Sequence, residues 1–247
     1  MSRTRKPVAM DKANTPQEAS RRSDIAAFLE TARTMAPANG RPAGRRGRLV
    51  FALDATMSRQ PTWDTACKLQ AEMFREAAKV GGLDIQLVYF RGLGECRAGK
   101  WAGDGRSLAA MMSRIDCRGG HTQIERVLRH VRAETGKAAV QALVYVGDAM
   151  EERVDDLCAV AGELGLLKVP AFVFQEGLDP VAERAFREIA RLTGGAYCRF
   201  DAGAAAQLKA LLSAVAVYAA GGHRALANYS KHHGGSARLL IEQMKTG

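Results

Sequence analysis

The chain has 247 residues, of which 47% are hydrophobic and 25% are charged, and its net charge is +10 at pH 7. This composition is typical of one globular domain with tails, and it excludes a largely disordered chain, a collagen-like repeat and a bare coiled coil. No apolar run reaches the roughly 18 residues that a membrane-spanning helix needs, and no apolar signal segment follows the basic N-terminus, so we expect a cytoplasmic protein without a membrane span.

The positive charge is concentrated at the two ends of the chain. Residues 1–48 carry 11 Lys and Arg against 4 Asp and Glu, residues 221–247 carry 4 against 1, and residues 49–220 carry 21 of each kind. Basic flanks can attract nucleic-acid phosphates without reading the sequence, but aromatic residues for base stacking are not interleaved with them. We favour solubilising tails and keep nucleic-acid binding as an alternative.

Residues 1–47 predict a basic arm with one short helix followed by a linker. Thr15, Pro16 and Glu18 supply a helix cap, a first-turn proline and the acid of a capping box. Residues 37–47 then mix Pro and Gly with Arg, as flexible linkers do. We expect the main domain to span residues 48–220, and residues 221–247 to form a basic C-terminal extension with a helix near 237–244.

From residue 48 onward, short β-rich apolar runs alternate with amphipathic stretches of helical length, which predicts a parallel α/β sheet. The expected strands are 49–53, 85–90, 95–101, 141–147, 169–174 and 196–200. The expected helices are 63–78, 123–134, 154–164, 181–192 and 204–219. Residues 91–94 are too short a link to join parallel strands, so the second and third strands should form an antiparallel hairpin. The predicted fold is a three-layer, doubly wound, Rossmann-like α/β fold whose mostly parallel sheet has one antiparallel edge strand.

Oxygen-bearing side chains cluster where ligands collect in such a fold, beyond the carboxyl ends of the strands. They are two carboxylates and three hydroxyls: Asp54, Thr56, Ser58, Thr122 and Asp148. The first three follow the first strand, Thr122 follows a Gly pair before a helix, and Asp148 follows the fourth strand. Because only oxygen ligands are present, the matching ion is a hard cation such as Mg²⁺ or Mn²⁺. Any one of these hydroxyls alone would be better explained as a helix cap.

The three parts of this pattern together resemble the von Willebrand factor A (vWA) domain, over about residues 48–218. In that family the D-x-[ST]-x-S segment, the lone Thr and the later Asp form the metal-ion-dependent adhesion site (MIDAS). The resemblance implies that Thr56 and Ser58 coordinate the metal through their hydroxyls and that Asp54 holds it directly or through water. It also implies that Thr122 and Asp148 complete the ligand set.

Two positions depart from the pattern of the family. Thr56 stands where Ser is commoner, which keeps the hydroxyl, and Gly147-Asp148-Ala149 replaces the usual Thr-Asp-Gly. Neutral hydroxyl ligands leave the cation electrophilic, so a vacant position on it can accept a carboxylate from another molecule. We therefore expect an adaptor or scaffold module that is not an enzyme, and whose protein partner offers an Asp or Glu to the metal.

A second resemblance points to an enzyme. Asp54 and the segment 147–152 are similar to the D-x-D and G-D-x-x-x-D motifs of the haloacid dehalogenase phosphatases, which depend on Mg²⁺. Here Thr56 stands in place of the general-acid Asp, and Thr122 is expected at the start of a helix and not at the end of a strand. A phosphatase is therefore the alternative. Glu151 and Glu152 have two possible roles. They either stabilise a helix N-terminus through the helix macrodipole, or contact the metal ligands without binding the ion themselves.

Overall fold

The computed structural model describes residues 46–232, except residue 80 and residues 201–204. The predicted arm helix, nearly all of the linker and the predicted helix near 237–244 lie outside the described residues. The nucleic-acid alternative depends on those flanks, and the domain boundaries at 48 and 220 stay predictions.

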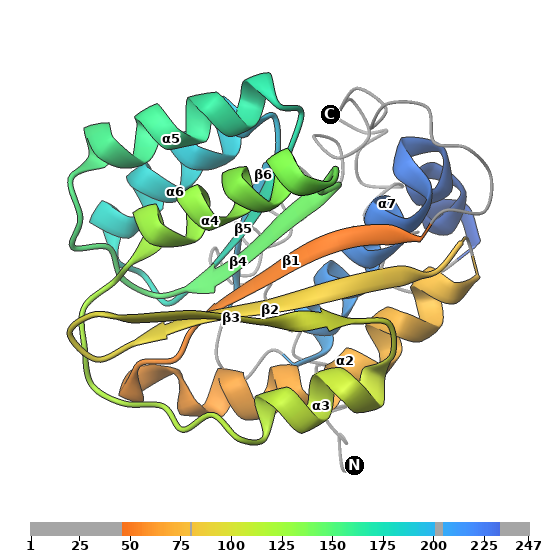
Figure 1. The fold of residues 1–247 in the computed structure, drawn as a ribbon, viewed down its shortest axis with the longest axis horizontal. Helices are drawn as coiled ribbons and strands as arrows, with labels where there is room; N and C mark the ends of the chain where they lie inside the picture. Colours follow the sequence, from red (N-terminus) through yellow and green to blue (C-terminus); the bar gives the residue numbers. More distant parts are fainter. Residues whose placement is uncertain (1–45, 80, 201–204, 233–247) are drawn as a thin grey trace, which may run out of the picture.

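Six strands form one sheet in the order β3-β2-β1-β4-β5-β6 (Figure 1). All neighbouring strands are parallel except β2 and β3, which pair as an antiparallel hairpin at the edge of the sheet. The strands are β1 (Gly47–Asp54), β2 (Leu83–Arg91), β3 (Glu95–Ala102), β4 (Ala142–Gly147), β5 (Ala171–Glu176) and β6 (Ala196–Phe200). The mostly parallel α/β fold with one antiparallel edge strand is confirmed.

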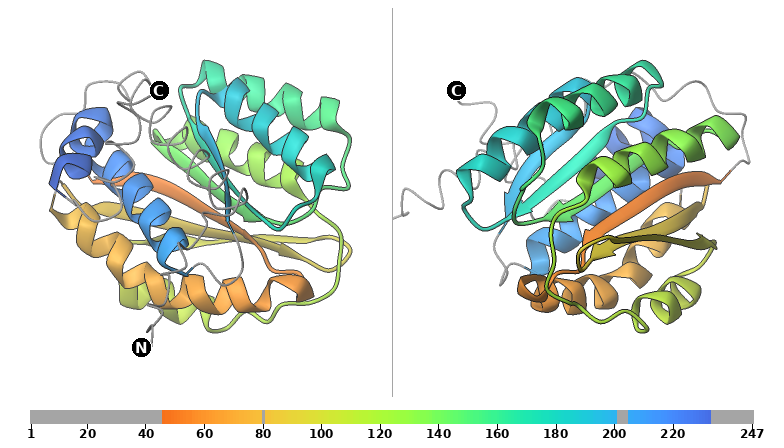
Figure 2. Two further views of the ribbon diagram at one scale, coloured as in Figure 1. Left: turned by 180° about the vertical axis from the view of Figure 1, so that it is seen from behind. Right: turned by 60° about the vertical axis from the view of Figure 1, so that its left-hand side comes forward.

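Helices cover both faces of the sheet, which makes three layers (Figure 2). The helices are η1 (Met57–Arg59), α2 (Gln60–Ala78), α3 (Gly105–Met112), α4 (Ile124–Lys137), α5 (Val154–Leu166), α6 (Pro180–Thr193) and α7 (Ala205–His232). One hydrophobic core lies between the sheet and α2, α3 and α7, and a second lies between the sheet and α4, α5 and α6. Strands β4 and β5 are buried along their whole length, which is why their sequences are nearly continuous apolar runs rather than alternating ones.

Several elements differ from the prediction. Helix α3 was not expected; Asp104 caps it by accepting a hydrogen bond from the Ser107 backbone N–H, and it buries Leu108 and Met112. Strand β5 begins and ends two residues later than expected. Helix α7 runs on to residue 232, with Gly222 at φ 69° as a non-helical kink inside it. No helix in the described part of the chain is long and apolar enough to cross a membrane.

Candidate metal site

The sheet brings the two carboxylates of the predicted site to the same edge. Asp54 is the last residue of β1, and Asp148 directly follows β4. These strands are parallel neighbours in which Leu53 pairs with Val146. The two residues therefore lie at adjacent strand ends, where β1 and β4 end on the left in Figure 1. We call the set Asp54, Thr56, Ser58, Thr122 and Asp148 the strand-end site.

Asp54 is a buried carboxylate, with only 2% of its surface exposed. Its Oδ1 accepts a hydrogen bond from the Thr56 backbone N–H at 2.8 Å. Burial raises the pKa of Asp54 to about 6, because the loss of solvation and the nearby charge of Asp148 outweigh the hydrogen bonds from Thr56 and the attraction of Arg59. A negative charge held here without a compensating cation therefore costs free energy.

Hydrogen bonds hold the segment that carries Thr122 against three other loops. The Arg118 N–H donates to Ala55 O at 2.9 Å, and the His121 N–H donates to Gly92 O at 3.1 Å. The Glu151 N–H donates to Thr122 Oγ1 at 3.1 Å, and the Thr122 N–H donates to Glu151 Oε2 at 3.2 Å. Thr122 is thus fixed beside the loop that carries Asp148.

One glycine of the predicted Gly pair is required by packing. A Cβ built on Gly120 would lie 2.2 Å from the backbone oxygen of Gly92, at the tip of the β2–β3 hairpin. Only glycine allows the two backbones to approach so closely. The close approach explains why a glycine stands in the segment before Thr122.

Asp54 ends β1, and Thr56, Thr122 and Asp148 lie on loops that these contacts join. Ser58 belongs to η1, in the same β1–α2 connection as Thr56. Thr122 precedes α4, whose N-cap residue is Gln123. Coordination of a metal by these residues stays a prediction.

The position of Tyr145 explains why a glycine, and not the usual threonine, stands at position 147. A Cβ on Gly147 would lie 2.5 Å from the Tyr145 hydroxyl and 2.9 Å from Cζ of the same ring. The ring is held in place by stacking on Phe90 and by an edge contact with Phe186. The threonine that is usual at this position in the vWA family would therefore clash.

The donors present fit a hydrated, hard divalent cation. In the described part of the chain, no group of three or more His, Cys, Asp or Glu side chains could hold a metal, so two carboxylates and the hydroxyls would share the ion. Two buried polar atoms, Arg59 Nε and the Tyr145 hydroxyl, have no hydrogen-bond partner among the described residues. Arg59 lowers the pKa of Asp54 against the effect of burial, and burial together with the charge of Asp54 raises the pKa of Tyr145. Water bound with an ion would supply hydrogen-bond partners for both atoms.

A buried ion pair beside the site was not predicted from the sequence. Arg59, at the end of η1, is 2% exposed, and its Nη1 donates to Oε2 of Glu176, the last residue of β5. The Thr62 hydroxyl donates to the same oxygen. The available signal was a glutamate at the end of an apolar run, but nothing in the sequence identified its partner.

Glu152 does lie at a helix N-terminus, but at that of α4 and not at that of the helix that follows it in the chain. Its carboxylate accepts from the backbone N–H groups of Ile124, at 2.5 Å, and Glu125, at 2.9 Å. It thus caps the N-terminus of α4 from another loop. Glu151 instead bonds to Thr122, as described above, and its Oε2 lies 2.8 Å from Nδ1 of His121.

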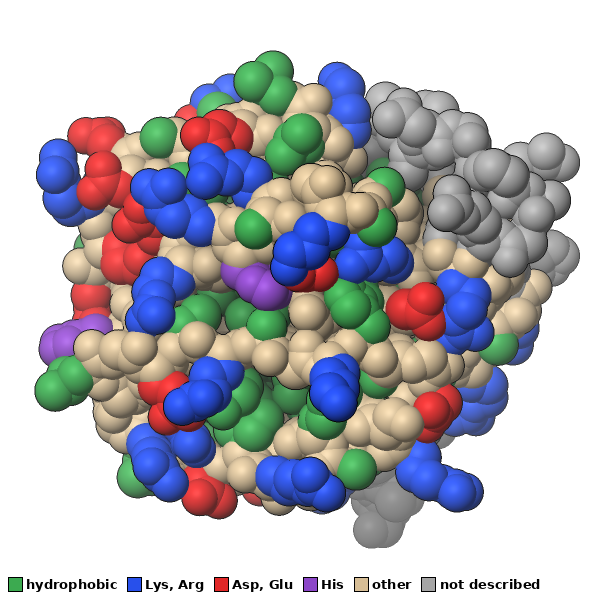
Figure 3. Space-filling model, in the orientation of Figure 1, with side chains coloured by type: hydrophobic (Ala, Val, Ile, Leu, Met, Phe, Trp, Pro, Cys, Tyr) green, Lys and Arg blue, Asp and Glu red, His purple; other side chains and the backbone are tan. Residues whose placement is uncertain are grey.

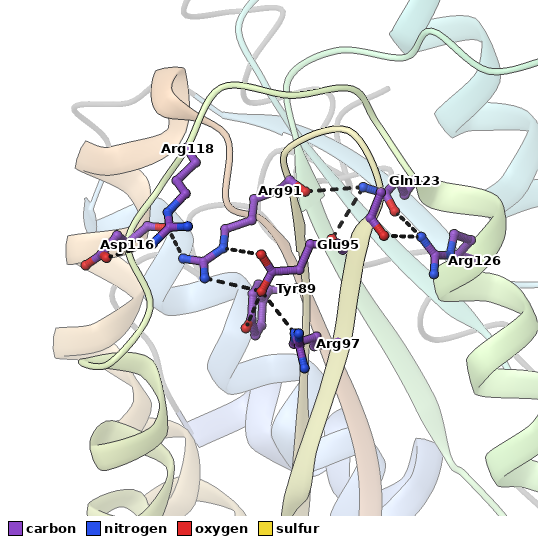
Figure 4. A network of polar contacts seen from close by, with 9 residues as sticks. Tyr89, Arg91, Glu95, Arg97, Asp116, Arg118, Gln123 and Arg126 are labelled. Atoms are coloured by element: carbon purple, nitrogen blue, oxygen red, sulfur yellow. Dashed lines mark hydrogen bonds and ion pairs between the residues drawn. The ribbon is translucent and has the colours of Figure 1, made fainter.

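A polar network braces the hairpin tip next to the site (Figure 4). Arg91 donates to Glu95 from Nε at 3.0 Å and to the backbone oxygen of Asp116 at 2.6 Å. The Tyr89 hydroxyl donates to Glu95 at 3.2 Å. Gln123 Nε2 reaches the backbone oxygens of Arg91 and Glu95 at 3.4 and 3.3 Å. These bonds tie the tip to the segment that carries Thr122.

No protein-family profile and no curated protein matches the sequence. Solved structures do match: a von Willebrand factor type A protein from Catenulispora acidiphila is 17% identical, with a TM-score of 0.56 over 71% of this chain and 43% of that one. The chain has the vWA fold. The match spans less than half of that protein's length.

Two further structures show the same vWA fold. The vWA domain of SpRpn10 is 11% identical, with a TM-score of 0.53 over 69% of this chain and 95% of that one. Proximal thread matrix protein 1 from the mussel byssus, whose MIDAS motif is occupied by zinc, is 12% identical, with a TM-score of 0.56 over 70% of this chain and 46% of that one. At these identities the likeness establishes the fold alone.

Proposed function

We propose that the chain is a protein-binding module that uses a MIDAS-type Mg²⁺ or Mn²⁺ ion to engage an Asp or Glu of a partner protein. The metal would be held by the residues of the strand-end site, with a position left for the partner's carboxylate. The vWA fold supports this proposal, and a metal-occupied MIDAS motif in one structure of similar fold supports a divalent cation.

The observation that carries the proposal is the burial of the Asp54 carboxylate. In the described part of the chain no basic side chain forms an ion pair with it, because Arg59 is paired with Glu176. Asp148 adds a second negative charge at the same edge. Buried carboxylates are normally paired with a cation or bound to a metal. A divalent ion would supply the missing positive charge.

We propose a binding role and not a phosphatase for two reasons. Thr56 has no carboxyl group to act as the general acid that the phosphatase pattern requires at this position. Thr122 lies in the segment before α4 and does not end a strand. Hydrolysis of a generic phosphate ester by the purified protein, lost in Asp54→Asn, would overturn the binding proposal.

Calorimetric titration with Mg²⁺ and with Mn²⁺ tests the site. We expect the wild type to bind one ion, and Asp54→Asn and Asp148→Asn to lose most of that affinity. Asp155→Asn is the matched control, because Asp155 is an exposed acid in the first turn of α5 and is not part of the proposed site. Equal loss in the control, or none in the two site variants, would contradict the proposal.

A further inference from the structure

A second surface lies on the α4 side of the β2–β3 hairpin. A hollow of about 390 Å³ opens there between α4 and the hairpin. Its floor is formed by Val88 of β2 and by Cys96 and Ala98 of β3. In Figure 3 apolar side chains are visible at the base of the hollow, with basic side chains and a histidine around it. We call this hollow the β3 groove.

The wall of the β3 groove on α4 is basic. Arg126, Arg129 and His130 line it from α4, at spacings that place them on one side of the helix. Arg129 is paired with Glu125 at 2.6 Å, and the His130 ring nitrogen lies 2.9 Å from Gln86. Arg126 has only neutral partners among the described residues: Nη1 donates to Gly94 O and to Gln123 Oε1, each at 2.6 Å. Its positive charge is therefore available to an anion.

The outer edge of β3 runs beside this groove and pairs with no other strand of the described sheet. The strand crosses the front of the molecule in Figure 1, between α4 and α3. On the α3 side, the sulfur of Met111 lies 3.0 Å from the Cβ position of Gly99, so an apolar side chain borders that face of the strand. A strand added to this edge would direct alternate side chains to the basic α4 side and to the α3 side.

We propose that the β3 groove and the free edge of β3 bind an extended acidic peptide of a partner protein by strand addition. The partner's main chain would hydrogen-bond to β3, its acidic side chains would face Arg126 and Arg129, and its alternate apolar side chains would lie toward Met111. This surface is separate from the strand-end site, and the proposal does not depend on a metal.

Charge decides between the possible occupants. The two flanks of this chain are basic, with 11 Lys and Arg against 4 Asp and Glu in residues 1–48 and 4 against 1 in residues 221–247, so the groove repels them. A second copy that paired edge to edge would bring together two strands that each carry Arg97 and Lys100 against a single acid, Glu95, and like charges across strands are destabilising. A lysine on an edge strand opposes such self-pairing. An acidic strand meets neither obstacle.

Fluorescence anisotropy tests the proposal with a labelled peptide of alternating Val and Glu, as long as β3. We expect binding that weakens by roughly tenfold or more in Arg126→Glu/Arg129→Glu, equivalent to at least about 1.4 kcal/mol. Arg184→Glu is the control, since Arg184 is an exposed residue of α6 that does not line the groove. Unchanged affinity in the double variant would overturn the proposal.

Two further probes separate strand addition from simple charge attraction. The same peptide with methylated backbone nitrogens keeps its charges but cannot donate strand hydrogen bonds, so it should bind at least tenfold more weakly. Equal binding of this peptide would overturn the strand geometry. Displacement of the acidic peptide by an oligothymidylate of equal charge would assign the groove to phosphate and overturn the peptide assignment. The variants should keep their circular-dichroism spectra, because both arginines are exposed.

Discussion

The strand-end site and the β3 groove differ in the solvent exposure of their charged groups. The strand-end site places a nearly inaccessible Asp54 beside Asp148 at the ends of parallel strands, near a buried Arg59–Glu176 pair. The β3 groove carries its charge on exposed arginines over an apolar floor. Burial makes the first region part of the stability of the fold, whereas solvent screens the second. Substitutions should therefore change stability in the first region and binding alone in the second.

The largest difference should come from the buried ion pair. Glu176→Gln leaves the Arg59 guanidinium buried without its carboxylate, and removal of one partner of such a pair costs about 3–5 kcal/mol. Urea denaturation measures this loss. The control is Glu163→Gln, which removes the exposed partner of Arg132 and should cost no more than about 1 kcal/mol. Similar losses in the two variants would contradict the contrast between buried and exposed charge.

Asp54 should make the stability of the metal-free protein depend on pH. Its pKa is raised from 3.8 to about 6, so the protonated form contributes stability that is complete below pH 3.8 and is lost as the pH rises through 6. The shift corresponds to about 3 kcal/mol. Asp54→Asn should remove this dependence, so the variant becomes more stable than the wild type above about pH 6 in a chelator-containing buffer.

Denaturation curves of both proteins at pH 4, 5, 6 and 7 provide the measurement. Mg²⁺ should restore stability to the wild type at pH 7 and leave Asp54→Asn unchanged, because the ion competes with protons for the ionised carboxylate. A free-energy difference between the two proteins that stays constant with pH would show that the Asp54 carboxylate is not in a costly environment.

A smaller effect is expected where the site departs from the vWA pattern. Gly147→Ala places a Cβ 2.5 Å from the Tyr145 hydroxyl, and such overpacking costs about 1–3 kcal/mol. Tyr145→Phe alone should be neutral or slightly stabilising, because the hydroxyl is buried without a partner among the described residues. Combined with Gly147→Ala it should recover part of the loss. Additive free energies in this double-mutant cycle would rule out the proposed contact.

The sequence predicted all six strands and the hairpin because burial of a sheet leaves a strong local pattern of apolar runs and turns. Helix α3 was missed because it has only 8 residues and buries only Leu108 and Met112, too few positions to show a helical period. The end of β5 was misplaced because Gln175 and Glu176 are polar. They continue the strand because Tyr197 and Arg59 satisfy them from other elements.

The site was predictable to the extent that strand order could be inferred. Asp54 and Asp148 each follow an apolar run, so their positions at one edge followed from the fold. The supporting contacts were not accessible, since Arg59 and Glu176 lie 117 residues apart, and Glu152 reaches the α4 N-terminus across 28 residues. Long-range polar pairs of this kind leave no periodic signal in a single sequence.

The smallest effect on stability should be found in the β3 groove. Arg126→Gln removes a charge whose partners are the neutral Gly94 oxygen and Gln123 amide, on the exposed side of α4. The free energy of unfolding should change by less than about 0.5 kcal/mol, while the affinity for the acidic peptide falls. A loss of stability comparable to that of Glu176→Gln would mean that Arg126 holds the hairpin tip in place through Gly94. The charge of Arg126 would then contribute to the stability of the fold. The contrast between buried charge at the strand-end site and exposed charge in the β3 groove would not hold.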